Sequence, residues 1–297
     1  MMDLKVYLHD RAALVDQALD QWLPGERLLP HTLHQSMRYS VFAGGKRLRP
    51  ILMMAASEAV GGTAQQVMHA ACAMEMIHTY SLIHDDLPAM DDDDFRRGRL
   101  TNHKVYGEAV AVLAGDALLT EAFRLLADTQ INRSNSPATV LRVIELVARF
   151  AGSQGMVGGQ VVDMESEGQE IDFPTLEYIH THKTGGLILA SVQAGALLGG
   201  GDEKQFAALS RFGGAAGLAF QIADDILNVV GDQAELGKNV GSDQARGKAT
   251  YPALLGLAEA RQRANELCDI AVEALTPLGA VAEPLQLLAR YIVDRNS

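Results

Sequence analysis

Segments of helical length, separated by proline and glycine, run along the whole chain. Alanine and leucine, both strong helix formers, are abundant, whereas the alternating Val, Ile, Thr and Tyr stretches that mark β-strands are scarce. Two helix starts carry capping signals, at Thr63 to Gln66 and at Ser136-Pro137. The pattern predicts an all-α protein of about ten helices.

No part of the chain reads as a linker between domains. None of the connecting segments is long, polar or of low complexity, and no fixed-period repeat is visible. Hydrophobic residues make up 48% of the 297 residues, which is enough for one large buried core. We therefore expect a single helical domain over residues 1–297.

The charge balance limits the partners of the chain. Acidic residues outnumber basic ones by 37 to 25, a net charge of −12, which argues against nucleic acid and anionic membranes as partners. Cys72 and Cys268 lack zinc-site or disulfide spacing, and no apolar run is long enough to cross a bilayer. These features predict a cytoplasmic protein without a transmembrane segment, in which any anionic ligand needs locally concentrated cations.

The first of two acidic clusters follows a long predicted helix. Residues 64–87 read as this helix, which ends in His84-Asp85-Asp86-Leu87, and Pro88 then leads into Asp91-Asp92-Asp93-Asp94. Carboxylates held this close repel one another unless solvent or a bound cation compensates them. Taken alone, the cluster fits a solvated acidic loop better than a metal site.

The second cluster lies inside an apolar helical run from Leu218 to Val230. Its polar side chains share one face that should line a cavity: Gln221, Asp225, Asn228 and Asp232, with Asp224 adjoining. In an alternative interpretation the carboxylates cap neighbouring helices or pair with arginines. Oxygen-only clusters suit a hard cation, and Mg²⁺ usually takes one or two protein carboxylates plus substrate phosphates. Together the two clusters predict a Mg²⁺ site and hence a phosphorylated ligand.

Basic residues gather at a few positions. The Lys46-Arg47 pair follows two glycines at a predicted helix start and is placed to bind a diphosphate, and Arg96-Arg97 follows the first acidic cluster. His78 lies two helical turns before Asp85 on the same face, although such a histidine is more often a hydrogen-bonded core residue. Further lysines stand near glycines: Lys183 precedes Gly185-Gly186, and Lys238 and Lys248 flank a segment able to close as a lid.

These motifs strongly resemble those of the short-chain trans-prenyl diphosphate synthases, and most closely the bacterial farnesyl diphosphate synthases. The segments are FAGGKRLRP at 42–50, IHTYSLIHDDLPAMDDDDFRRG at 77–98, GGQVVDM at 158–164, HKTGG at 182–186, FQIADDILNVVGD at 220–232 and GKNVGSDQARGKATYP at 237–252. The resemblance implies an all-α fold of the isoprenoid synthase type, with helices around a deep central cavity, working as a homodimer. It also implies Mg²⁺-dependent head-to-tail condensation of isopentenyl diphosphate with allylic diphosphates.

The resemblance assigns roles to residues at the matching motif positions. As ligands of Mg²⁺, three ions with substrate bound, it implies Asp85, Asp86, Asp91, Asp224, Asp225 and Asn228. For isopentenyl diphosphate it implies Lys46, Arg49, His78 and Arg97. For the allylic diphosphate it implies Arg96, Lys183, Thr184, Gln221 and Lys238, with Lys248 assisting on closure. Catalysis is expected to depend on Asp85, Asp224, Lys183, Thr184 and Gln221, which stabilise the departing diphosphate and the allylic carbocation.

Two side chains before the first motif bear on product length. Tyr80 and Ser81 lie about one helical turn before Asp85, along the cavity wall that a growing prenyl tail would follow. An aromatic residue there, with two extra residues before Asp91, resembles farnesyl more than geranylgeranyl synthases. We expect mainly a C15 product, with C20 as the alternative. Asn228 stands where the family commonly has aspartate, so we expect a higher Mg²⁺ requirement.

Three other functions fit parts of the sequence. A class I terpene cyclase also ionises allylic diphosphates at an aspartate-rich motif, but it has no need for the second diphosphate site that the basic motifs indicate. A metal phosphohydrolase of the HD type could use His84-Asp85, but the repeated aspartate motif would then have no explanation. A non-catalytic subunit of a hetero-oligomeric synthase usually lacks intact aspartate motifs.

Overall fold

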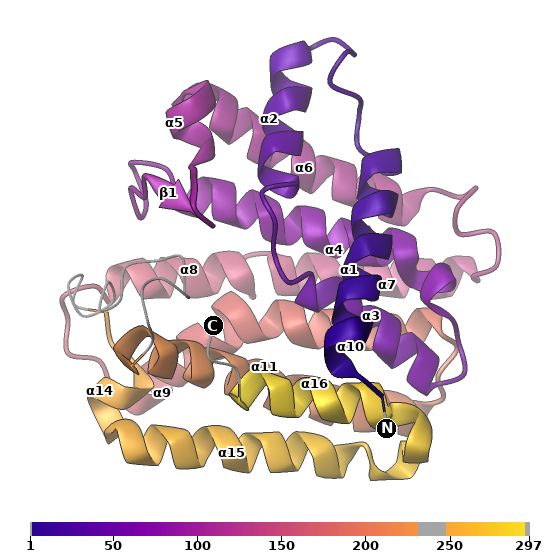
Figure 1. Cartoon of the computed structure of the whole chain (residues 1–297), viewed down its shortest axis with the longest axis vertical. Coiled ribbons are helices and arrows are strands. Elements are labelled where there is room, and N and C mark those ends of the chain that lie inside the picture. Colours follow the sequence, from indigo (N-terminus) through magenta and orange to yellow (C-terminus); the bar gives the residue numbers. More distant parts are fainter. Residues whose placement is uncertain (1, 231–247, 295–297) are drawn as a thin grey trace.

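The computed structural model describes residues 2–230 and 248–294, which form helices and one short β-hairpin (Figure 1). The first half contains α1 (Leu4–Trp22), α2 (His31–Val41), α3 (Leu48–Ala59), α4 (Ala64–Asp85), β1 (Phe95–Arg96), β2 (Arg99–Leu100), α5 (Asn102–Tyr106), α6 (Glu108–Ala127) and α7 (Pro137–Ala151). The second half contains α8 (Met156–Glu165), α9 (Phe173–Ile179), the π-helix η1 (His180–Gly185), α10 (Gly186–Leu198), α11 (Glu203–Val230), α14 (Tyr251–Leu255), α15 (Leu257–Ala274), the 3₁₀-helix η2 (Thr276–Ala282) and α16 (Glu283–Asp294). The all-α prediction is confirmed, although the estimate of about ten helices missed short ones such as α5, α9 and α14.

Local capping signals position α4. The Gln66 N–H donates to Thr63 Oγ1 at 3.3 Å, and the Thr63 N–H donates to Gln66 Oε1 at 2.7 Å, which is the capping box predicted from the sequence. At the other end Asp85 is the last helical residue and Asp86 is the C-cap, because Pro88 disfavours further helix. Both aspartates therefore lie at the C-terminal end of α4, which is buried over most of its length.

A series of neighbouring helices builds the core in the order α6, α4, α3, α10, α11 and α15. The central members α3, α4 and α10 are buried over most of their length, so they carry apolar side chains on nearly all faces. In Figure 1 α2, α5 and α6 occupy the upper part and α15 and α16 the lower part, with α10 between them. Within the described ranges, no helix is long and apolar enough to cross a membrane.

The β-hairpin was not predicted from the sequence. Phe95 pairs with Leu100 and Arg96 with Arg99, and the two turn residues Arg97 and Gly98 both have positive φ, at 53° and 73°. A two-residue turn with positive φ at both positions matches the twist of paired strands. The hairpin holds Arg96 and Arg97 beside the end of α4.

Candidate functional site

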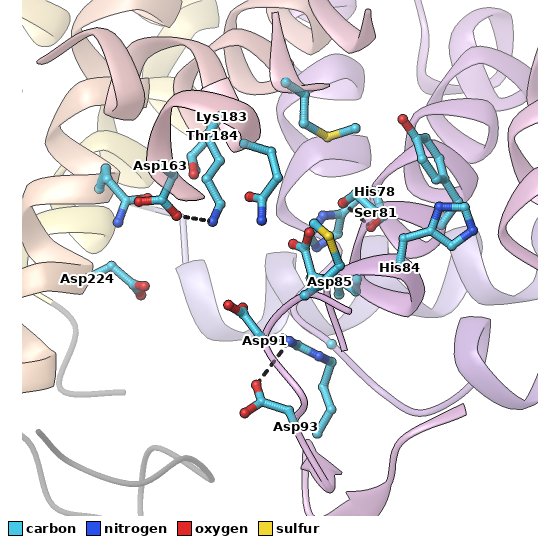
Figure 2. A pocket seen from close by; sticks show the side chains of 18 of the residues that line it. His78, Ser81, His84, Asp85, Asp91, Asp93, Asp163, Lys183, Thr184 and Asp224 are labelled. Atoms are coloured by element: carbon cyan, nitrogen blue, oxygen red, sulfur yellow. Dashed lines mark hydrogen bonds and ion pairs between the residues drawn. The ribbon is translucent and has the colours of Figure 1, made fainter. Parts of the chain in front are cut away.

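One cavity of about 1830 Å³ brings both acidic clusters together. Residues of α4, α8, η1 and α11 line it, together with the loop after α4 (Figure 2). The predicted site residues on its wall are Lys46, Arg49, His78, Tyr80, Ser81, Asp85, Asp91, Arg96, Arg97, Lys183, Thr184, Gln221, Asp224, Asp225, Asn228 and Lys248. Lys238 lies outside the described residues, as does most of the segment expected to act as a lid.

Asp85 and Asp91 lie at the same side of this cavity. The Asp91 N–H donates to the Asp85 carbonyl oxygen at 2.8 Å, which folds the loop back onto the end of α4. Burial raises the pKa of the Asp85 carboxyl to about 6, and Asp91 and Asp86 add to the rise while Lys183 opposes it. A bound cation would stabilise the ionised carboxylate that burial and like charges disfavour here.

Asp86 does not line the main cavity. Its buried carboxylate accepts hydrogen bonds from Arg96, at 2.7 Å from Nε and 2.6 Å from a terminal guanidinium nitrogen. Burial raises the pKa of Asp86, although Arg96 opposes the rise. The pair joins the hairpin to the end of α4, so Asp86 holds the Arg96 side chain in place at the cavity wall.

Asp224 and Asp225 adjoin in α11 but have different surroundings. Asp224 lines the cavity, where Figure 2 shows its carboxylate on the side that faces Asp91. The Asp225 side chain is 4% exposed and accepts hydrogen bonds from His180 Nε2 at 2.7 Å, the Tyr251 N–H at 3.0 Å and Gln221 Nε2 at 3.1 Å. Both Asp225 oxygens are thereby engaged, and the carboxylate joins α11, η1 and α14 at the cavity wall.

Two lysines meet carboxylates across the cavity. Lys183 Nζ lies 2.6 Å from Asp163 Oδ2, and Lys248 Nζ lies 3.2 Å from Asp91 Oδ1 and 3.6 Å from Asp163 Oδ2. Burial alone would raise the pKa of Asp163, but the two ammonium groups hold it below its ordinary value. Sequence reasoning assigned Asp163 no role, although it belongs to the GGQVVDM segment of the family resemblance.

A second group of cations surrounds Arg49 on α3. Burial lowers the pKa of Arg49 to about 10, and the nearby Arg97 guanidinium contributes to this shift. Burial also holds the pKa of His78 well below its ordinary value, reinforced by Arg49 and Arg97. Arg49 Nε is buried without a hydrogen-bond partner among the described residues. These buried cationic side chains repel one another, and a bound anion would offset that repulsion.

Arg47 is not available to a ligand, contrary to the expectation for the Lys46-Arg47 pair. Its guanidinium is 1% exposed and lies 2.7 Å from Glu75 Oε1 and 2.8 Å from Asp16 Oδ1. The buried Glu75 carboxylate needs this counter-charge, since an unpaired buried charge is strongly destabilising. Lys46 remains on the cavity wall.

The π-helix η1 carries Lys183 and Thr184 to the cavity. It packs closely on α8, because a Cβ atom at Gly159 would lie 2.4 Å from the Lys183 backbone nitrogen. It also packs closely on α11, because a Cβ at Gly217 would lie 3.0 Å from the Gly185 Cα. Glycines on both neighbours thus fix where the Lys183 backbone lies.

The donor set fits Mg²⁺ bound together with a phosphorylated ligand. Asp85, Asp91 and Asp224 offer hard oxygen donors from two sides of one cavity. Across residues 2–230 and 248–294, no three His, Cys, Asp or Glu side chains converge tightly enough to hold a metal ion by themselves. Mg²⁺ usually keeps water and uses few protein carboxylates, so substrate oxygens would complete its coordination.

Comparisons with known proteins agree with this geometry. The family model described as "Polyprenyl synthetase" matches residues 30–282. A farnesyl diphosphate synthase of Geobacillus stearothermophilus is 52% identical, with 88% of each chain covered. A dimethylallyltranstransferase of Fischerella ambigua is 49% identical over 99% of this chain and 84% of its own. Among solved structures, a geranylgeranyl pyrophosphate synthetase from Pyrococcus horikoshii superposes with a TM-score of 0.87 at 32% identity, covering 98% of both chains.

Proposed function

The chain belongs to the polyprenyl synthetase family and is a prenyltransferase that elongates prenyl chains, and we propose that its main product is farnesyl diphosphate. In this proposal, isopentenyl diphosphate is added to dimethylallyl and then to geranyl diphosphate. Geranylgeranyl diphosphate is the second candidate product, because a synthetase of that name is among the similar structures.

The position of Tyr80 carries the proposal for a C15 product. Tyr80 is 6% exposed and lines the cavity with Ser81, about one turn of α4 before Asp85. A prenyl tail that runs from a diphosphate near Asp85 along α4 meets the phenol ring. Burial raises the pKa of Tyr80 to about 12, so the ring stays neutral and closes the channel with a mainly apolar surface.

The cations around Lys183 are assigned to the allylic diphosphate. Lys183, Lys248 and Arg96 would stabilise the charge that develops on the leaving group as the allylic C1–O bond breaks. Lys238 is assigned to the same diphosphate by its motif position alone. Thr184 and Gln221 also line the cavity, and their oxygen atoms are assigned to stabilising the allylic cation.

The cations around Arg49 are assigned to isopentenyl diphosphate. Lys46, Arg49, His78 and Arg97 would hold its diphosphate so that its double bond faces C1 of the allylic cation. The double bond attacks C1, and a proton then leaves C2, which yields the elongated diphosphate and inorganic diphosphate. The released diphosphate is the proposed acceptor of that proton.

We assign Mg²⁺ to Asp85, Asp91 and Asp224, with Asn228 in support and three ions present when substrate is bound. When bound, the ions would neutralise charge on the departing diphosphate. Asp86 and Asp225 are assigned to supporting positions, because Arg96 and His180 already engage their carboxylates.

Tyr80→Ala is expected to lengthen the product. Removing the phenol ring opens the channel beyond the C15 tail, so geranylgeranyl diphosphate should replace farnesyl diphosphate as the main product. The measurement is chromatography of the prenyl alcohols made from labelled isopentenyl diphosphate and geranyl diphosphate by the variant and by the wild type. Unchanged C15 product from Tyr80→Ala would place the channel end elsewhere.

The working unit in this proposal is a homodimer. On α6 Leu113 is exposed, and α5, which packs against α6, exposes Val105. Neighbouring exposed apolar side chains of this kind mark a surface that another chain covers. Sedimentation equilibrium is expected to give about twice the 31.9 kDa mass of one chain. A single-chain mass at micromolar concentration would contradict the dimer.

A cytoplasmic location is part of the proposal. Cys72 and Cys268 are both free and buried, as thiols are in a reducing compartment.

A further inference from the structure

His84 contacts Tyr80 and has no part in the prenyl transfer assigned above. The two rings meet edge to face, with centroids 5.7 Å apart and an interplanar angle of 78°. Both side chains line the cavity, and Figure 2 shows His84 beyond Asp85 as seen from Asp224. His84 therefore lies at the end of the cavity assigned to the prenyl tail, on the side of Asp85 away from Asp224.

The backbone of α6 holds the other side of the imidazole. His84 Nε2 lies 3.0 Å from the Val112 carbonyl oxygen, to which it donates. A Cβ atom at Gly115 would lie 2.1 Å from Nε2 and 2.6 Å from Cδ2 of His84. A Cβ atom at position 115 would overlap the ring in this position, so the imidazole lies against α6 on one side and Tyr80 on the other.

We propose that His84 is a positioning residue for product length. Its imidazole contacts the Tyr80 ring on one side and the α6 backbone at Val112 and Gly115 on the other, and so holds the Tyr80 ring in place. The inference rests on the proposed function, in which Tyr80 ends the channel. Without the imidazole, the phenol ring can turn into the vacated space, and a C15 tail can then extend past it. His84 would thus act on selectivity between products rather than on bond formation.

The test compares His84→Ala, Gly115→Ala and the double variant by their C20-to-C15 product ratio from geranyl diphosphate. Gly214→Ala is the matched control, because nothing lies within 4 Å of a Cβ atom there. Loss of one edge-to-face contact is expected to raise the ratio roughly fivefold in His84→Ala. Gly115→Ala should raise it as well, because the new methyl group displaces the imidazole. The double variant should match His84→Ala rather than exceed it, since the clash disappears with the ring.

The outcomes separate this inference from the proposed function. An unchanged ratio in His84→Ala, when Tyr80→Ala raises it, overturns the role of His84 and leaves the C15 assignment standing. An unchanged ratio in Tyr80→Ala overturns the assignment of Tyr80 itself. Should His84→Ala not fold, Gly115→Ala decides, because a ratio equal to that of Gly214→Ala would overturn the proposal.

Discussion

Asp224→Asn is expected to lower kcat/KM for the allylic diphosphate by roughly 10³-fold. The substitution keeps the size of the side chain but removes a negative charge from one of the three cavity carboxylates assigned to Mg²⁺. The enzyme should therefore also need more Mg²⁺ for half-maximal activity. Steady-state kinetics at increasing Mg²⁺ concentration measures both effects.

The neighbouring substitution Asp225→Asn is the matched comparison. Its carboxylate accepts hydrogen bonds from His180, Gln221 and the Tyr251 N–H, so the change should lower the free energy of unfolding by about 1–3 kcal/mol. The Mg²⁺ concentration for half-maximal activity should stay near the wild-type value. An increase as large as that of Asp224→Asn would make Asp225 a metal ligand after all. Urea unfolding and the same Mg²⁺ titration distinguish the two roles.

Gly159→Ala is expected to lower kcat/KM for the allylic diphosphate on the order of 10²-fold. The new Cβ would lie 2.4 Å from the Lys183 nitrogen, 2.9 Å from its Cα and 3.0 Å from the His182 carbonyl carbon. These are backbone atoms, so no side-chain rotation relieves the clash and η1 must move away from α8. Lys183 and Thr184 then leave the positions from which they would act on the leaving group.

Gly214→Ala provides the control for helix propensity, because its methyl group meets no atom within 4 Å. It should retain wild-type kinetics. Far-UV circular dichroism and thermal unfolding of both variants show whether Gly159→Ala still folds. A folded Gly159→Ala enzyme with kinetics equal to those of Gly214→Ala would mean that the backbone position of η1 does not limit catalysis.

Features that depend on a few neighbouring residues could be predicted from the sequence. The capping box at Thr63 and the end of α4 before Pro88 are local, and both are present. The shared cavity of the two acidic clusters followed from the helical spacing of Gln221 and Asn228 together with the family resemblance. Local propensity and hydrophobic period are sufficient for the capping box and the helix end.

Features that depend on distant partners could not be predicted. Arg47 looked like a ligand for an anion, and only the fold brings Glu75 to it in a buried pair. Asp225 was assigned to metal by its motif position, and only the fold shows that His180, 45 positions away along the chain, lies 2.7 Å from its carboxylate. No spacing rule connects such residues, because the packing of whole helices decides which charges meet.

The chain length of the product made by the wild-type enzyme tests directly whether farnesyl diphosphate is its main product. Purified protein is incubated with Mg²⁺, labelled isopentenyl diphosphate and either dimethylallyl, geranyl or farnesyl diphosphate, and the extracted prenyl alcohols are separated by chromatography. We expect farnesol as the main product from both shorter primers and little label incorporated with farnesyl diphosphate. Geranylgeraniol as the main product from every primer would contradict this expectation.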